Sequence, residues 1–179
     1  MISLPPLPPE AGDPQLRAFY VYWRGRAPDG RLPGRQHIDP LDVPALLPCL
    51  MLMDVVPQAG APPGSALPIL RFRVRVAGGM LVDLIGANPT GQFLDDYVAE
   101  SRRAQLNDAY TGVVRNRVAH YWVNQLWTPG REFVRVQRLA LPLARDGETV
   151  DMVVACYARV EVPPPDGAMP DGLGAGGVS

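Results

Sequence analysis

The segment ILRFRVRVA, residues 69–77, predicts the element on which the rest of the fold depends. Its apolar and charged side chains alternate and separate onto two faces, with Leu70, Phe72, Val74 and Val76 on one and Arg71, Arg73 and Arg75 on the other. A period of two is the period of a β-strand. We therefore predict a strand whose apolar face meets the core and whose arginines meet water.

Four other segments have strand character. Residues 49–56, CLMLMDVV, contain no polar side chain before position 54, which predicts a buried strand. Residues 118–127, 132–143 and 149–160 are rich in apolar and aromatic residues, and a Pro-Gly and an Asp-Gly pair mark the turns between them. The predicted order is two strands, a helical crossing and a three-stranded antiparallel meander.

Helical spacing appears before and between these strands. Asp13 and Pro14 suit the start of a helix, and the apolar stripe that follows at 3.6-residue spacing consists of Leu16, Phe19, Tyr20 and Trp23. A longer helix is predicted after Ser101, and short helices are predicted at residues 39–47, ended by Pro48, and at residues 92–100. Together the elements predict an α+β domain whose single sheet carries helices on one face.

Length and composition limit the domain organisation and the class of protein. The 179 residues suit one domain, which we place at residues 13–162 between a Pro-rich tail at 1–12 and a disordered Pro/Gly-rich tail at 163–179. A net charge of -1 argues against nucleic acid as a partner. No apolar run reaches the roughly 20 residues that span a bilayer, and the start is unlike a secretory signal, so we expect a cytoplasmic protein that does not bind membranes. All 17 basic residues are arginine, which hints at a bacterial source with a GC-rich genome.

Five short motifs follow one another along the chain. They are Leu32-Pro33 with Arg35 and Ile38-Asp39-Pro40; Leu46-Leu47-Pro48 with Met51 and Asp54; Phe72-Arg73-Val74-Arg75-Val76-Ala77-Gly78; Gly86 with Thr90-Gly91 and Leu94; and Pro142-Leu143 with Asp146-Gly147. In this order and spacing the sequence resembles the family of bacterial stand-alone PAS-like domains over residues 16–160. The resemblance implies a PAS-like five-stranded antiparallel sheet with helices on one face, an N-terminal flanking helix, and a ligand cavity between sheet and helices.

The ligand and cofactor remain open from the sequence, but several groups are disfavoured. Photoactive flavin would need a reactive cysteine near residues 86–94, which read GANPTGQFL. Haem would need an axial side chain on an apolar helix, whereas His37 lies in an irregular connection and His120 starts a predicted strand. Two histidines without a cysteine cluster disfavour a metal site. No phosphate loop, dinucleotide fingerprint or common hydrolase motif is present, and we expect no catalytic residues and no enzyme.

If the implied cavity exists, its walls should come from the inner face of the sheet and the helical crossing. The candidate ligand-binding residues are Met51, Met53, Phe72, Val74, Tyr110, Trp122 and Tyr157, with His120 at the edge as a pH-responsive contact. The alternative is that these side chains form an ordinary core. Asp39 and Arg75 are assigned a structural role, as an ion pair that fixes the irregular connection to the sheet.

These features favour a non-enzymatic sensory or regulatory module in signal transduction, which binds a small molecule or a signalling protein partner. The stripe of the first helix either packs on its own domain or makes a homodimer through the N-terminal helix. One alternative is an interaction or scaffold protein whose core is filled, and the space among Phe72, Tyr110 and Trp122 would distinguish the two. The other is an isomerase or hydrolase on a cone-shaped α+β fold, which would use Asp108, Tyr110 and His120 around one pocket.

Overall fold

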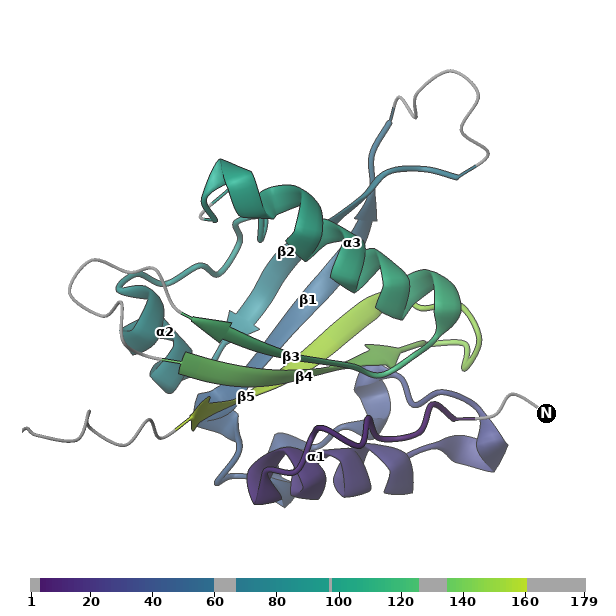
Figure 1. Cartoon of the computed structure of the whole chain (residues 1–179). Coiled ribbons are helices and arrows are strands. Elements are labelled where there is room, and N and C mark those ends of the chain that lie inside the picture. The colour runs from purple at the N-terminus through teal and green to yellow at the C-terminus, as the bar shows by residue number, and fades with distance from the viewer. Residues whose placement is uncertain (1–3, 60–66, 97, 126–134, 161–179) are drawn as a thin grey trace, which may run out of the picture.

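Five antiparallel strands form one sheet in the order β2-β1-β5-β4-β3 (Figure 1). The computed structural model describes residues 4–59, 67–96, 98–125 and 135–160. The strands are β1 Leu50–Pro57, β2 Leu70–Ala77, β3 His120–Gln125, β4 Arg135–Leu143 and β5 Met152–Val160. The predicted α+β class, the five strands and their antiparallel pairing are confirmed. Predicted strand residues 126–127 and 132–134 and the tail at 163–179 lie outside the described residues.

Strand β2 confirms most of the alternation that the sequence predicts. Leu70, Phe72 and Val74 are buried, but Val76 is 53% exposed, and its predicted place in the core is wrong. The cause is an irregularity in the pairing with β1, where Met53 pairs with Val74 but Leu52 pairs with Val76. The one extra residue on β2 turns the end of this strand, so that the next side chain faces the other side of the sheet.

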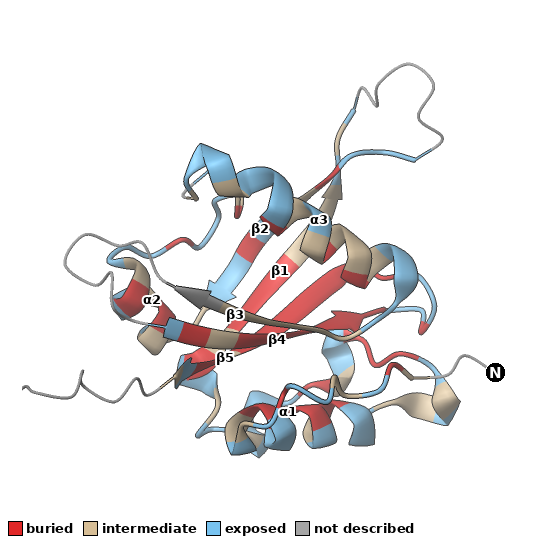
Figure 2. Cartoon of the chain, in the orientation of Figure 1, coloured by how far each residue is buried: buried red, intermediate tan, exposed pale blue. Residues whose placement is uncertain are grey.

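Helices α2 Gly79–Ile85 and α3 Glu100–Asn116 lie over one face of the sheet, which we call the inner face (Figure 1). On α3, Leu106, Tyr110 and Val113 are buried, and the Tyr110 ring lies 5.2 Å from that of Phe72. Helix α2 contributes Leu81 and Leu84 to the core. Buried residues therefore line the strands and the sides of the helices that face them (Figure 2).

The helix predicted at residues 92–100 is wrong. Phe93 instead forms an isolated bridge with Arg73, and Leu94 N donates to Phe72 O at 2.8 Å. This segment therefore gives its backbone hydrogen bonds to the open edge of β2. Edge strands offer unpaired N–H and C=O groups to any neighbouring extended segment, and that pairing replaces the local helix.

Helix α1 Pro14–Gly25 packs against the opposite face of the sheet (Figure 1). Its predicted cap is confirmed, because the Asp13 carboxylate accepts from Gln15 N and Leu16 N. The stripe of Leu16, Phe19, Tyr20 and Trp23 is buried, and Trp23 Nε1 donates to Pro142 O at 3.1 Å. The preceding segment packs here too, since Tyr20 OH donates to Pro5 O at 2.9 Å. The stripe therefore covers the chain's own sheet, and a homodimer through α1 would have to use another side of this helix.

The irregular connection between α1 and β1 contains short 3-10 turns rather than the predicted helix at residues 39–47. They are Pro28–Gly30, Arg35–His37, Pro40–Asp42 and Leu47–Cys49. Pro48 lies inside the last of these turns. The predicted ion pair between Asp39 and Arg75 is also wrong. Asp39 accepts from Leu41 N as a cap, and Arg75 Nε pairs with Asp54 Oδ1 across β1 and β2 at 3.0 Å, because the neighbouring strand holds that carboxylate closer.

Two consecutive glycines at the end of β2 give a matched test of this packing. A Cβ on Gly78 would collide with the backbone of Leu47 and Pro48, whereas a Cβ on Gly79 would meet nothing within 4 Å. Gly78→Ala is therefore expected to lower the free energy of unfolding by about 1–3 kcal/mol. Gly79→Ala, at the start of α2, should leave it unchanged or raise it by up to about 1 kcal/mol. Urea denaturation of both variants checks this, and equal effects would contradict the close approach of the two backbones.

No helix in the described part of the chain combines the length and the apolar character needed to cross a bilayer.

Candidate functional site

The inner face of the sheet carries a buried arginine. On β4, Arg138 pairs with Trp122 of β3 on one side and with Tyr157 of β5 on the other, so the three side chains share the face that α3 covers. Arg138 is 2% exposed, and no other charged residue in the described part of the chain is buried. Its guanidinium lies 4.4 Å from the ring centre of Tyr110 and 5.1 Å from that of Trp122. We call Tyr110, Trp122, Arg138 and Tyr157 the Arg138 cluster.

Arg138 faces aromatic rings and tyrosine hydroxyls rather than a carboxylate. None of the ion pairs between described residues includes Arg138, and its Nε and Nη2 atoms have no hydrogen-bond partner there. Burial lowers the pKa of Arg138, but Tyr110 and Tyr157, which carry negative charge in the alkaline range where arginine titrates, raise it by more, so that the net shift of the pKa is upward. The guanidinium stays positive. A buried charge with free donors is costly unless another group pairs with it.

A cavity of about 130 Å³ lies beside the Arg138 cluster. Apolar side chains from the sheet, α2, α3 and the segment between the helices form most of its wall. The lining residues are Met51, Leu81, Leu84, Ile85, Leu94, Val98, Leu106, Val136, Arg138 and Tyr157. Arg138 is the one charged residue among these lining residues. The hydroxyl of Tyr157 lies 3.3 Å from the hydroxyl of Tyr110. An apolar cavity with a few convergent polar groups is the usual form of a small-molecule site.

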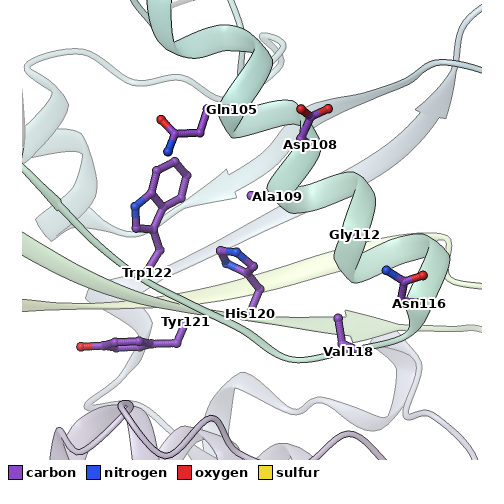
Figure 3. A pocket seen from close by; sticks show the side chains of 9 residues that line it. All are labelled: Gln105, Asp108, Ala109, Gly112, Asn116, Val118, His120, Tyr121 and Trp122. Carbon is purple, nitrogen blue, oxygen red and sulfur yellow. The ribbon is translucent and has the colours of Figure 1, made fainter.

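A wider groove of about 510 Å³ lies between α3 and the edge strand β3 (Figure 3). Gln105, Asp108, Ala109, Gly112, Asn116, Val118, His120, Tyr121 and Trp122 line it. His120 and Trp122 point toward α3, and their rings meet edge to face at 6.1 Å (Figure 3). Trp122 also contacts Arg138, so this member of the Arg138 cluster forms part of the groove wall.

His120 is held neutral by its surroundings. Burial lowers its pKa from the ordinary value of 6.5, and the positive charge of Arg138 lowers it further. Its Nδ1 atom is buried without a hydrogen-bond partner among the described residues. The protonated form would place a second cation next to Arg138, in the same low-dielectric region.

The lowered pKa of His120 predicts the direction of a pH effect on stability. Below the ordinary value of 6.5, unfolding lets His120 take up a proton that the folded protein refuses. The free energy of unfolding should therefore fall as the pH drops from 6.5 toward the folded pKa, and it should not change through His120 above 6.5. Denaturation of the wild type and of His120→Gln at several pH values measures the difference. The Gln variant should lose this part of the slope, and equal slopes would show that His120 titrates normally.

The predicted ligand-binding residues divide into four groups. Met51 and Tyr157 line the cavity, and His120 and Trp122 line the groove. Tyr110 lies between Phe72 and Arg138. Met53, Phe72 and Val74 are fully buried, line neither hollow, and pack as core. The space expected among Phe72, Tyr110 and Trp122 is occupied by the guanidinium of Arg138, and the actual cavity lies on the α2 side of it.

Sequence reasoning missed Arg138 and the walls that α2 supplies. In the segment RVQRLALPL, Arg138 follows the polar Gln137 and breaks the alternation of the first three residues, although the strand period places it on the same face as the apolar Val136. A usable signal was present, because β4 was predicted as the middle strand of the meander. A middle strand covered on both faces has no outward side.

The isomerase or hydrolase alternative is not supported by the geometry. It needs Asp108, Tyr110 and His120 around one pocket. Asp108 is exposed at the border of the groove, whereas Tyr110 is buried against Phe72 and Arg138. Among the residues described, no three His, Cys, Asp or Glu side chains are grouped to hold a metal ion.

Comparison with known proteins gives one extensive match. A model of the PAS domain family matches residues 12–158 of the chain. No curated protein sequence matches it significantly. A crystal structure of a domain of an HTR-like protein from Haloarcula marismortui has 12% identity and a TM-score of 0.41, with 62% of this chain and 98% of that chain covered. A domain of a protein named as a light and redox sensing histidine kinase from the same organism has 11% identity and a TM-score of 0.42, with 68% and 97% covered.

Proposed function

The chain belongs to the PAS domain family, and on this basis we propose that it is a non-enzymatic sensory module that binds a small molecule in the cavity beside Arg138. PAS domains are sensory signalling modules, so the family gives the general class of function. The observation that carries the more specific proposal is the apolar cavity of about 130 Å³ between the inner face and the helices, with Arg138 in its wall. The space among Phe72, Tyr110 and Trp122 is filled, as the scaffold alternative expects, but the hollow beside Arg138 is not, and this favours a ligand site.

The volume of the cavity favours a small ligand. An apolar cavity of about 150 Å³ is known to hold benzene, which has six non-hydrogen atoms. A cavity of about 130 Å³ therefore suits a ligand of similar size. Typical drug-sized molecules occupy pockets of roughly 300–1,000 Å³. We accordingly infer a ligand of about six non-hydrogen atoms, held mainly by apolar contacts and oriented by a few polar groups.

A route by which a ligand could affect the rest of the molecule runs through β5. The Tyr157 side chain lines the cavity on the inner face, and the Tyr157 carbonyl accepts from Gln15 Nε2 of α1 at 2.8 Å. The wall of the cavity also includes α3, whose other residues form the groove. A ligand that binds two arrangements of these elements with different affinity would shift their populations, and a signalling partner at the groove or at α1 could read the change.

The proposal is tested by binding of small probes to the full chain. Butan-1-ol, butyramide and butyrate have five or six non-hydrogen atoms and cover neutral and charged forms. We expect at least one of them to shift the amide signals of residues around the cavity in NMR spectra and to raise the melting temperature. Leu81→Phe, which fills the cavity from α2, should abolish the effect. Val21→Phe, on the exposed side of α1, is the matched control and should retain it.

If none of these probes binds, or if Leu81→Phe binds them as well as the wild type does, the cavity is not a ligand site and the proposed function is wrong.

A further inference from the structure

We propose that Arg138 binds the carboxylate of the ligand, so that the cavity selects short-chain monocarboxylates over neutral molecules of the same shape. This inference rests on the proposed function and names the chemical class of its ligand. Three features carry this inference. Two atoms of the Arg138 guanidinium have no hydrogen-bond partner, no carboxylate of the described residues pairs with Arg138, and the rest of the cavity wall is mainly apolar.

The free atoms of Arg138 are the two that form one edge of the guanidinium. Nε and Nη2 point in the same direction and can donate two parallel hydrogen bonds to one carboxylate. Arg71 shows this arrangement elsewhere in the chain, with Nε 3.0 Å from Oδ2 and Nη2 2.7 Å from Oδ1 of Asp95. In Arg138 the same two atoms are buried and without a hydrogen-bond partner among the described residues. Both atoms have almost no accessible surface, so a ligand carboxylate would take the place that Asp95 takes on Arg71 once the Arg138 side chain turns this edge toward the cavity.

The electrostatics of the cavity favour an anion. Arg138 is the charged residue among the lining residues, and none of them is acidic. The faces of Tyr110 and Trp122 attract the cation but neutralise none of its charge. In a region of low dielectric, the attraction between a guanidinium and a carboxylate is stronger than in water, and the ligand would satisfy the free donors. The Tyr157 hydroxyl also lines the cavity and can donate to the bound carboxylate.

The rest of the cavity fixes the other end of the ligand. Met51, Leu81, Leu84 and Leu106 provide an apolar wall without a further charged group. Once a carboxylate occupies part of the 130 Å³, about three to five carbon atoms fit in the remainder. Hydrocarbon in this wall gains from burial, whereas a second carboxylate would be buried without a partner. The site therefore suits a monocarboxylate rather than a dicarboxylate or inorganic phosphate.

The decisive comparison uses butyrate and butyramide, which have nearly the same shape but differ in charge. Isothermal titration of the full chain at constant ionic strength should give a dissociation constant at least about tenfold lower for butyrate, because charge-assisted hydrogen bonds are about twice as strong as neutral ones. Arg138→Met should lose this preference but still bind butyramide. Arg138→Lys keeps the charge without the planar fork, and it should fall between the two. Arg73→Met removes an exposed arginine from β2 and should bind butyrate as the wild type does.

The pKa of His120 is a second measurement, and a ligand bound through apolar contacts alone would not change it. Arg138 and the exposed Asp108 are the charged groups that border His120 in the cluster and the groove. Because the charge of Arg138 lowers the pKa of His120, a carboxylate bound to Arg138 should raise that pKa. The NMR signal of the His120 imidazole, assigned by its loss in His120→Gln, should move accordingly with butyrate and not with butyramide.

Each outcome supports or overturns the inference. Equal affinity for butyrate and butyramide, or an unchanged preference in Arg138→Met, would show that Arg138 does not select a carboxylate, while the proposed cavity site would stand. Binding of neither probe would overturn the proposed function as well. Tighter binding of phosphate than of butyrate would show an anion site of another class. Circular dichroism establishes that each variant is folded before its affinity is interpreted.

Discussion

Trp23→Ala is expected to lower the free energy of unfolding by about 3–5 kcal/mol, the usual range for removal of a buried aromatic side chain. Trp23 is 0% exposed and packs between α1 and the outer face of the sheet. Its ring stacks on that of Tyr20 at 6.0 Å, and its indole nitrogen donates to Pro142 O. The substitution would leave both a cavity and an unpaired carbonyl.

The matched control is Val21→Ala on the same helix. Val21 is 68% exposed, so its truncation should change the free energy of unfolding by no more than about 0.5 kcal/mol. Urea denaturation at several protein concentrations measures both variants and also tests where α1 packs. If the stripe covers its own sheet, the wild-type midpoint should not depend on concentration. A midpoint that rises with concentration would show that copies of the chain associate, and a small effect of Trp23→Ala would contradict the packing of the stripe on its own sheet.

The elements that the sequence predicted well are those whose apolar pattern is local and strong. The alternation in β2 and the stripe of α1 each repeat with the period of one element, and both are present in the structure. The capping carboxylate of Asp13 is also a local signal, since it bonds to the first turn of the helix it precedes. Local patterns of this kind depend on which face is buried, and they do not require knowledge of the partner.

The features that were wrong depend on contacts between distant segments. Residues 92–94 bond to the backbone of β2 because this strand has a free edge beside them, and Val76 is exposed because β2 carries one extra residue between the positions that pair with Leu52 and Met53. Neither cause can be found in the local sequence. The pairing of Arg75 with Asp54 likewise reflects the register of two strands rather than a motif. In each case tertiary pairing overrides local preference.

The candidate site shows the same division. Met51 and Tyr157 were predicted from their place on the inner face, and both line the cavity. The exact position of the cavity could not be predicted. It depends on α2, a segment for which the sequence predicted no helix or strand, and on the size of the Arg138 side chain. Arg138 fills the space expected to be empty and moves the hollow toward Leu81 and Leu84.

Arg138→Met is expected to raise the free energy of unfolding by about 1–4 kcal/mol in carboxylate-free buffer, the range seen when buried ion pairs are replaced by apolar side chains of similar volume. Arg138 holds a full charge at 2% exposure, with two donor atoms unpaired among the described residues. Methionine would remove the desolvation penalty and fill nearly the same space. Arg73→Met is the control, because exposed arginine pairs contribute no more than about 1 kcal/mol.

The sign of this effect separates a structural from a functional role for Arg138. If the arginine served mainly to hold Tyr110 and Trp122 in place, Arg138→Met would be destabilised like other core variants. If instead it serves a ligand, the variant should be the more stable protein without butyrate. Added butyrate should then stabilise the wild type in proportion to the logarithm of its concentration and stabilise Arg138→Met much less. When the free energy of unfolding is plotted against butyrate concentration, the curves of the wild type and Arg138→Met are expected to cross. The buried charge of Arg138 destabilises the domain without ligand and stabilises it when a carboxylate is bound.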